Sequence, residues 1–194
     1  MGNLVSFSTQ CLPLGQLKEM LASKVFIETG CFRGWSLGYA LGIGFDKCYS
    51  CDIDPEMIDF CNNNLGKYKD KFQIVQADSC TFLTDLLPQL DDIDSIIFYL
   101  DAHLPGWDKG GEREITITKF TFPLEQELEI INRFRPNRND LIIVDDLRLY
   151  EDGDFESGNW DLRAQFGLSL DFISRFGYSI SRFYQQEGYF VLTK

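Results

Sequence analysis

Carboxylate side chains stand at the ends of five apolar runs of the sequence. Each run predicts a strand, and the acids at the strand ends are Glu28, Asp52, Asp78, Asp101, Asp145 and Asp146. Because ligands of open α/β sheets bind beyond the carboxyl ends of the strands, we expect these side chains on one rim. Crowded like charges are unfavourable, so they call for a cation or for hydrogen-bond donors from a ligand. A single aspartate here often only caps a helix, whereas the joint pattern favours a ligand site.

Residues 25–36 predict a strand, a tight turn and the start of a helix. Gly30 and Gly34 in the turn would let the backbone approach a ligand that faces the helix N-terminus. The spacing is not the G-x-G-x-x-G fingerprint of dinucleotide-binding proteins, because Glu28 stands at the first glycine position. A carboxylate there would repel a pyrophosphate but suits a ligand with a positive amine or sulfonium.

Three residues further along the rim suit an adenosine group. Asp52 ends the second predicted strand, where a carboxylate can accept hydrogen bonds from both ribose hydroxyls. Ile53 would lie against one face of the adenine, and Asp78 could accept a hydrogen bond from its exocyclic amine. These residues together predict a site for an adenosine-type ligand.

The elements that must position these side chains alternate between strand and helix. Strands are expected at residues 25–28, 47–51, 72–76, 95–100 and 141–144, and a terminal hairpin at 178–184 and 189–193. Helices are expected near residues 14–21, 35–41, 54–65, 78–87, 123–134 and 162–173. This alternation predicts one α/β domain over residues 1–194, with a mostly parallel sheet and helices on both faces. Residues 1–24 are expected to form an N-terminal extension with a short helix, and residues 103–122 a lid loop.

Composition excludes some classes of partner. The net charge is −12, which argues against a broad surface for nucleic acid or anionic membrane. The sequence shows no signal peptide and no apolar run of membrane-spanning length, so we expect a cytoplasmic protein. Its six cysteines are then expected to be reduced, buried thiols. Cys48 and Cys51 have the spacing of a redox or metal pair, but in a strand they would point to opposite faces.

Three motifs together resemble the class I S-adenosylmethionine-dependent methyltransferases. They are IETGCFRG at residues 27–34, SCDID at 50–54 and QAD at 76–78. The resemblance covers residues 25–194 and implies a Rossmann-like three-layer sandwich with a seven-stranded sheet of order 3-2-1-4-5-7-6, strand 7 being antiparallel. It implies S-adenosylmethionine as the cofactor, bound by Glu28, Thr29, Gly30, Gly34, Ser36, Asp52, Ile53, Asp78, Ser79 and Asp101.

A narrower resemblance concerns the ends of the fourth and fifth strands. Asp101-Ala-His103 and Asp145-Asp146 are similar to the metal-dependent O-methyltransferases of the catechol and macrolide-sugar types. The resemblance implies one Mg²⁺ held by Asp101, Asp145 and Asp146, which would orient an acceptor hydroxyl and lower its pKa. His103, the one histidine of the chain, could take the hydroxyl proton, so Asp101 and His103 are the candidate catalytic residues.

The acceptor and the assembly stay open at this point. A small molecule or a sugar is the expected substrate, with Trp107, Phe120 and Phe122 as residues that could cover it. Arg148 and Tyr150 are weaker candidates for the same pocket, and residues 1–14 are a candidate homodimer contact. Two other functions are considered: a nicotinamide-dependent oxidoreductase, disfavoured by Glu28 and by the absence of a Tyr-xxx-Lys pair after the fifth strand, and a cofactor-binding module without catalysis.

Overall fold

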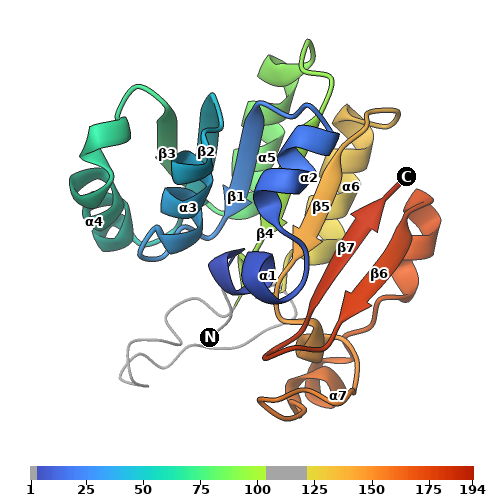
Figure 1. The fold of residues 1–194 in the computed structure, drawn as a ribbon. Coiled ribbons are helices and arrows are strands. Elements are labelled where there is room, and N and C mark those ends of the chain that lie inside the picture. Colours follow the sequence, from blue (N-terminus) through green and yellow to red (C-terminus); the bar gives the residue numbers. More distant parts are fainter. Residues whose placement is uncertain (1–3, 104–121) are drawn as a thin grey trace.

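The computed structural model describes residues 4–103 and 122–194, and all its strands belong to one sheet. The strand order is β3-β2-β1-β4-β5-β7-β6 (Figure 1). The strands are β1 (Val25–Thr29), β2 (Lys47–Asp52), β3 (Phe72–Gln76), β4 (Ile96–Leu100), β5 (Leu141–Val144), β6 (Ser179–Phe183) and β7 (Tyr189–Thr193). Strands β1 to β5 are parallel to one another, and β7 pairs antiparallel with both β5 and β6. The expected order and the antiparallel seventh strand are therefore confirmed.

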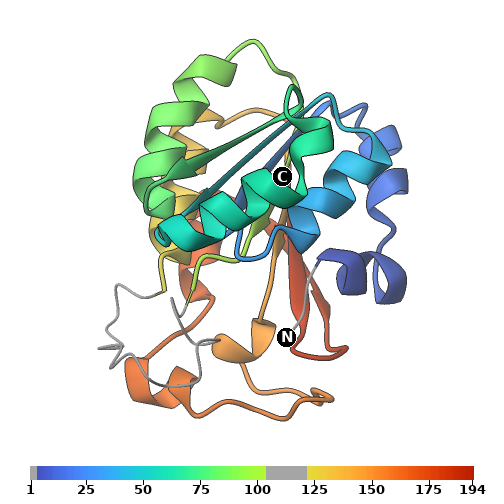
Figure 2. The same cartoon turned by 90° about the vertical axis from the view of Figure 1, so that its left-hand side faces the viewer.

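Helices cover both faces of the sheet, which gives three layers (Figure 2). The α-helices are α1 (Leu4–Gln10), α2 (Leu14–Met20), α3 (Trp35–Ile43), α4 (Pro55–Asn64), α5 (Ser79–Leu86), α6 (Leu124–Phe134) and α7 (Leu162–Phe166). Three short 3₁₀ helices of the described chain follow α-helices, namely η1 (Gly66–Tyr68), η2 (Leu87–Leu90) and η6 (Asp171–Phe176), and η5 (Leu147–Leu149) follows β5.

Alternate strand residues divide the core into two clusters. In β4, Phe98 and Leu100 pack with residues of α5 and α6, whereas Ile97 and Tyr99 pack with residues of α1, α2 and α3. This alternation follows from the two-residue period of a strand, and both sides are apolar because both are covered. The continuous apolar run at β4 thus has the buried, central position that it predicts.

Two of the strand-end acids begin helices. The Asp54 carboxylate accepts a hydrogen bond from the Glu56 amide at 3.0 Å, and Asp78 accepts one from the Thr81 amide at 3.0 Å. Pro55 occupies the first turn of α4, where its missing N–H is not needed. Both helix starts are confirmed, and the caps fix the chain direction where it leaves β2 and β3.

The structure differs from the expected elements in two places. Residues 4–10 form α1, which no sequence pattern indicates, and Leu4 and Phe7 are fully buried against the core. The single helix expected over residues 162–173 is instead α7 and η6, because Gly167 has φ +63° and ends α7.

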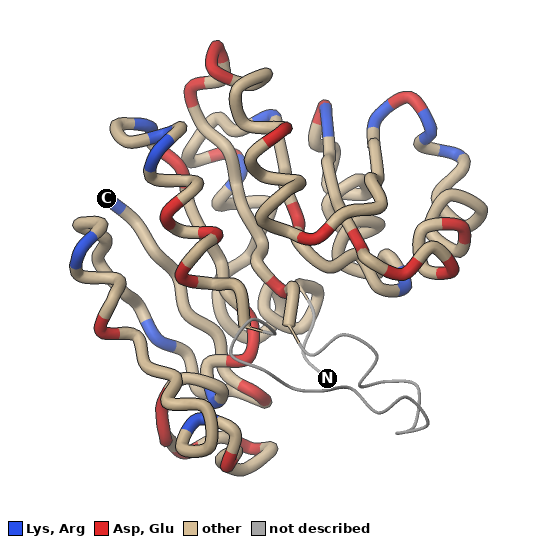
Figure 3. Tube along the Cα trace, turned by 180° about the vertical axis from the view of Figure 1, so that it is seen from behind, with Lys and Arg blue, Asp and Glu red and all other residues tan. Residues whose placement is uncertain are grey.

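Most of the predicted lid, residues 104–121, lies outside the described residues. Within residues 4–103 and 122–194, no helix has both the length and the apolar character needed to cross a membrane. Figure 3 shows Lys and Arg (blue) interspersed with Asp and Glu (red) along the described chain.

Candidate active site

The turn after β1 is packed so closely that its glycines are required. Gly30 has φ +83°, and a Cβ there would lie 2.8 Å from the carbonyl oxygen of Asp101. The amides of Gly30 and Cys31 both donate hydrogen bonds to the carbonyl of Cys51, at 3.1 and 2.9 Å. Gly34, with φ +70°, precedes α3 as its N-cap. The turn therefore touches the ends of both neighbouring strands, β2 and β4.

Asp52 links this turn to the loop after β2. Its Oδ2 accepts a hydrogen bond from the Phe32 amide and its Oδ1 one from the Asp54 amide, each at 2.9 Å. A carboxylate has about four acceptor positions, so two remain for ligand hydroxyls. Asp52 is half-buried, and the role of ribose ligand stays a prediction.

Glu28 is buried next to the turn. It is 1% exposed, and its Oε2 accepts a hydrogen bond of 2.8 Å from the Ser50 hydroxyl on β2. The pKa of Glu28 is raised to about 8, mainly by burial and to a smaller extent by the nearby Cys61 and Asp52, while the Ser50 hydrogen bond opposes the rise. The carboxyl group is therefore mostly protonated near neutral pH, and a cation placed beside it would favour ionisation.

Three hydroxyl residues predicted to bind the cofactor have protein partners. The Thr29 hydroxyl accepts a hydrogen bond from the Asp101 amide at 3.3 Å, and the Ser36 hydroxyl accepts one from the Leu4 amide at 3.1 Å. The Ser79 hydroxyl is hydrogen bonded to Glu127. These three hydroxyl groups are hydrogen bonded within the protein. Any contact with a cofactor would therefore use a second hydrogen bond of the same hydroxyl or a backbone group of the same residue.

The adenine end is open by comparison. Ile53 is 51% exposed, as expected of a residue that could cover a ring. Both oxygens of Asp78 are engaged by Thr81, through its amide at 3.0 Å and its hydroxyl at 2.7 Å. The Thr81 amide lowers the pKa of Asp78, which is therefore an anion and a helix cap.

Asp101, His103 and Asp146 form a cluster at the ends of β4 and β5. His103 Nε2 lies 2.5 Å from Asp146 Oδ2, and His103 Nδ1 lies 3.6 Å from Asp101 Oδ1. One ligand atom from each of the three residues lies within 4.8 Å of the others. Asp146 reaches this position with φ +53°, a left-handed conformation that an aspartate tolerates better than most residues.

The electrostatics of the cluster favour a charged pair. Burial lowers the pKa of His103, but the Asp146 carboxylate raises it by more, so the net direction is upward. Burial raises the pKa of Asp146, but His103 and Arg148 lower it by more. Arg148 Nε lies 3.4 Å from Asp146 Oδ1, and its guanidinium stacks 4.0 Å from the ring centroid of Trp160.

Asp145 is not among the three residues whose ligand atoms meet in this cluster, and its role as a cation ligand stays a prediction. It is 3% exposed, and its Oδ2 accepts a hydrogen bond of 2.6 Å from the Tyr99 hydroxyl. Its Oδ1 accepts one from the Asp146 amide at 2.8 Å. Asp145 continues the alternation of β5 and points into the sheet face that holds Tyr99, whereas the left-handed turn brings Asp146 to the rim. The cluster in the structure therefore consists of Asp101, His103 and Asp146, whereas the predicted set was Asp101, Asp145 and Asp146.

Glu127 is a buried acid near the site that the sequence reading missed. It is 2% exposed on α6, and burial raises its pKa to about 7, against the hydrogen bonds from Ser79 and Thr29. Its Oε1 has no hydrogen-bond partner among residues 4–103 and 122–194. The signal was present, because Glu127 falls on the apolar helix face marked by Leu124, Leu128 and Ile131.

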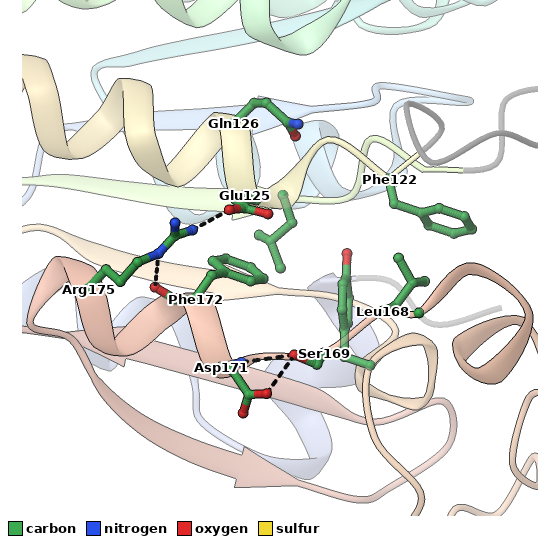
Figure 4. Close-up of a pocket in the computed structure, with 11 residues that line it drawn as sticks. Phe122, Glu125, Gln126, Leu168, Ser169, Asp171, Phe172 and Arg175 are labelled. Carbon is green, nitrogen blue, oxygen red and sulfur yellow. Dashed lines mark hydrogen bonds and ion pairs between the residues drawn. The ribbon is translucent and has the colours of Figure 1, made fainter.

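A pocket of about 410 Å³ lies between the start of α6 and η6. Figure 4 shows Phe172 beside the ion pair of Glu125 and Arg175 on one side, with Phe122 on the other. Tyr150, just after η5, also lines it. Phe122 is buried and packs on Phe166 at a ring separation of 5.7 Å, while Trp107 and Phe120 lie outside the described residues.

Several solved structures with a similar fold are methyltransferases or are provisionally assigned as such. A Staphylococcus aureus protein provisionally assigned as a caffeoyl-CoA O-methyltransferase has a TM-score of 0.58 and 17% identity, covering 93% of this chain and 80% of that one. A Bacillus cereus O-methyltransferase in complex with S-adenosylhomocysteine has a TM-score of 0.53 and 14% identity, covering 93% and 79%. The methyltransferase domain of a bacterial Hen1 protein has a TM-score of 0.56 and 11% identity, covering 93% and 95%.

These likenesses establish the fold. The chain has the Rossmann-like fold of S-adenosylmethionine-dependent methyltransferases, which the sequence motifs indicate independently. No protein-family model matches the chain, and no curated protein matches its sequence.

Proposed function

We propose that this protein is an S-adenosylmethionine-dependent O-methyltransferase that acts on a hydroxyl of a small molecule or sugar, assisted by a divalent cation. The observation that carries the proposal is the cluster of Asp101, His103 and Asp146 beside the Gly30 turn of this fold. The methyl donor and the methyl acceptor would thus bind side by side at the same edge of the sheet. The broad acidic balance of the chain supports a small acceptor over a nucleic acid.

The cofactor half of the proposal is supported by the turn and its acids. The Gly30 turn allows close backbone approach, Asp52 keeps free acceptor capacity, and Glu28 is a buried acid that a nearby cation would ionise. S-adenosylmethionine carries both a sulfonium and an ammonium group. A dinucleotide, with its pyrophosphate, would meet the same acids without compensation.

The cation half is supported by the donor set. Two carboxylates and one imidazole lie within reach of a single ion. Asp146 Oδ1 is buried and makes no hydrogen bond among the described residues, although the Arg148 guanidinium forms an ion pair with it at 3.4 Å. Carboxylate oxygens suit Mg²⁺, and the imidazole extends the choice to Mn²⁺. When bound, the ion would polarise the acceptor hydroxyl and lower its pKa.

The protein's own residues would orient the acceptor and handle its proton. Asp146 fixes the His103 ring through the 2.5 Å contact. If the two carboxylates alone hold the cation and His103 is neutral, His103 can take the acceptor's proton, and Asp146 would stabilise the imidazolium that forms. The pocket lined by Phe172 and Tyr150 offers aromatic faces to a ring-bearing acceptor. Methyl transfer would then follow from holding the hydroxyl oxygen in line with the donor methyl group.

Calorimetric titration with S-adenosylmethionine and S-adenosylhomocysteine tests the cofactor half. Both should bind, and Asp52→Ala should weaken binding by about 10- to 100-fold, because it removes charged hydrogen-bond acceptors. Lack of binding by either compound would refute the proposal. Binding of a reduced nicotinamide cofactor in their place would favour the oxidoreductase.

Transfer of a labelled methyl group to a panel of sugars, catechol-like rings and small acids tests the chemistry. We expect turnover with Mg²⁺ or Mn²⁺ and its loss with a chelator. Equal turnover with and without the chelator would remove the cation and leave His103 and Asp146 as an acid–base pair. Cofactor binding without transfer to any acceptor would favour a binding module.

A further inference from the structure

Two thiols meet beneath the glycine turn. Cys31 lies in the turn, Cys61 lies on α4, and their sulfur atoms are 3.7 Å apart. Cys31 is 3% exposed and Cys61 is fully buried. Cys61 Sγ also lies 3.2 Å from the carbonyl oxygen of Phe32. The sequence gives no hint of this pair, because its members are thirty positions apart.

The pair with redox spacing in the sequence is not the pair that meets in space. Cys48 packs in the cluster beneath α1, α2 and α3, and Cys51 in the cluster beneath α5 and α6. The sheet separates them, as the strand period requires. Cys31 and Cys61 are therefore the pair that the fold brings together.

The backbone around the two sulfurs leaves little room for them to move apart. A Cβ at Gly34 would lie 2.9 Å from Cys61 Sγ, so α4 is seated directly against the turn. The Cys31 amide is held by the Cys51 carbonyl at 2.9 Å. A disulfide needs sulfur atoms about 2.0 Å apart, so the present 3.7 Å must shorten by roughly 1.7 Å.

We propose that Cys31 and Cys61 are a redox modification site, at which a reversible disulfide joins the glycine turn to α4. The hydrogen bond between the thiols lowers the pKa of Cys61 and raises that of Cys31, so Cys61 is the better nucleophile. Gly34 adds a geometric reason for the pairing, since only a residue without a side chain lets Cys61 reach the turn.

The oxidant is a peroxide, and the reaction balances in two steps. The Cys61 thiolate attacks one oxygen of hydrogen peroxide, the O–O bond breaks, and the product is a sulfenic acid plus hydroxide, which takes a proton to become water. The Cys31 sulfur then attacks the Cys61 sulfur, and the S–O bond breaks with loss of a second water. The two thiols lose two electrons and the peroxide gains them; a dithiol reductant reverses the change.

The disulfide would change the geometry of the turn. Phe32, between Cys31 and Arg33, donates its amide to Asp52 and has φ +41°, so it has little freedom to absorb a shift. Drawing the turn toward α4 moves this amide relative to Asp52. The effect on cofactor affinity rests on the proposed function, whereas the formation of the bond does not.

Peptide mapping of the full chain tests the bond itself. Wild-type protein is treated with equimolar hydrogen peroxide, alkylated under denaturing conditions and digested. We expect one cross-linked species containing Cys31 and Cys61, with a mass lower by about 2 Da than the reduced pair. Cys48→Ala, which removes a buried thiol of β2, should keep the cross-link, and Cys61→Ser should lose it. Recovery of both as alkylated thiols, or a cross-link to other cysteines, would overturn the proposal without any variant.

Amide hydrogen exchange and cofactor titration then test the coupling. Exchange at residues 30–34 should slow at least several-fold on oxidation, recover with dithiothreitol and stay constant in Cys61→Ser; unchanged exchange would overturn the link to the turn. S-adenosylhomocysteine should bind the oxidised wild type several-fold more weakly than the reduced form, and equal affinity would contradict the effect on the site. If neither form binds, the proposed function fails while the map and the exchange data still decide on the thiol pair.

Discussion

The turn after β5 gives two adjacent aspartates different environments. Asp145 is directed inward to the Tyr99 hydroxyl, and Asp146 outward to His103. The sequence reading treated both as cation ligands, because residue type alone does not show which side chain a left-handed turn exposes. Only the backbone angles of Asp146 separate them.

Asp146→Asn should weaken binding of Mn²⁺ at least about tenfold, because it removes one of the two anionic ligands of the cluster. Titration of Mn²⁺ followed by its paramagnetic resonance signal measures this directly. Asp154→Asn removes the same charge from an exposed position and serves as the control. Equal Mn²⁺ affinity in wild type and Asp146→Asn would contradict the assignment of the cluster.

Glu28 makes the stability of the fold depend on pH. Its pKa is raised from 4.5 to about 8, so between these values the folded chain keeps a proton that the unfolded chain releases. The stability contributed by this group is complete below pH 4.5 and is lost as pH rises through about 8, with a slope of at most about 1.4 kcal/mol per pH unit. Ser50, Asp52 and Cys61 are the groups that face it.

Glu28→Gln should flatten this part of the profile, because the amide keeps the Ser50 hydrogen bond and carries no proton to lose. Denaturant unfolding at half-unit pH steps measures the slope. Glu19→Gln, on an exposed helical position, should leave the profile unchanged. A Glu28→Gln profile parallel to wild type would show that Glu28 ionises normally in the folded chain.

Among the elements, α6 is fixed to the start of β4 by one buried cation. Arg135, at the C-terminal end of α6, is 2% exposed and pairs with both oxygens of Asp140 at 2.6 and 2.8 Å. Its guanidinium also donates to the carbonyls of Leu90 and Ile93. Asp140 in turn accepts a hydrogen bond from the Ile96 amide at 2.8 Å. These contacts set the position of the two strands that end in the acid cluster.

Arg135→Met should lower the free energy of unfolding by about 3–5 kcal/mol, because it removes the buried counter-charge of the Asp140 carboxylate and leaves only the hydrogen bond from the Ile96 amide. Arg133→Met, two residues earlier and exposed, should change it by less than about 0.5 kcal/mol. Urea unfolding of the two variants gives the comparison. Similar values for both would contradict a structural role for the buried pair.

At the scale of the whole molecule, the segment before β1 is part of the core. Phe7 is fully buried, and its ring lies 5.3 Å from that of Tyr189 on β7 and 6.1 Å from that of Phe183 on β6. Ser6 donates a hydrogen bond of 2.5 Å to Gln186 in the hairpin turn. Phe7 is thus covered within the chain, and a homodimer contact through residues 1–14 stays a prediction.

Phe7→Ala should destabilise the protein by about 3–5 kcal/mol, since it leaves a cavity between α1 and the hairpin. Val5→Ala, on the exposed side of the same helix, is the matched control. Thermal and denaturant unfolding of both variants measure the difference. A small loss for Phe7→Ala would mean that α1 is only loosely attached.

Most of the fold follows from local patterns, whereas the site depends on long-range geometry. Apolar runs and caps such as Asp54 and Asp78 were enough to predict the strands, the helix starts and, through the family resemblance, the sheet order. The break at Gly167 was missed because the apolar spacing continues across it. The contact of Cys31 with Cys61, and the presence of His103 where Asp145 was expected in the cluster, depend on the backbone angles of loops. No local sequence pattern encodes these angles.

The contact of α1 with the hairpin also sets the order of events during synthesis. Ser6 and Gln186 are 180 residues apart, so at 5–20 residues per second α1 leaves the ribosome on the order of ten to forty seconds before its partner. During that interval Leu4 and Phe7 have no β7 to pack against. That face of the core can therefore close only after the hairpin has been translated.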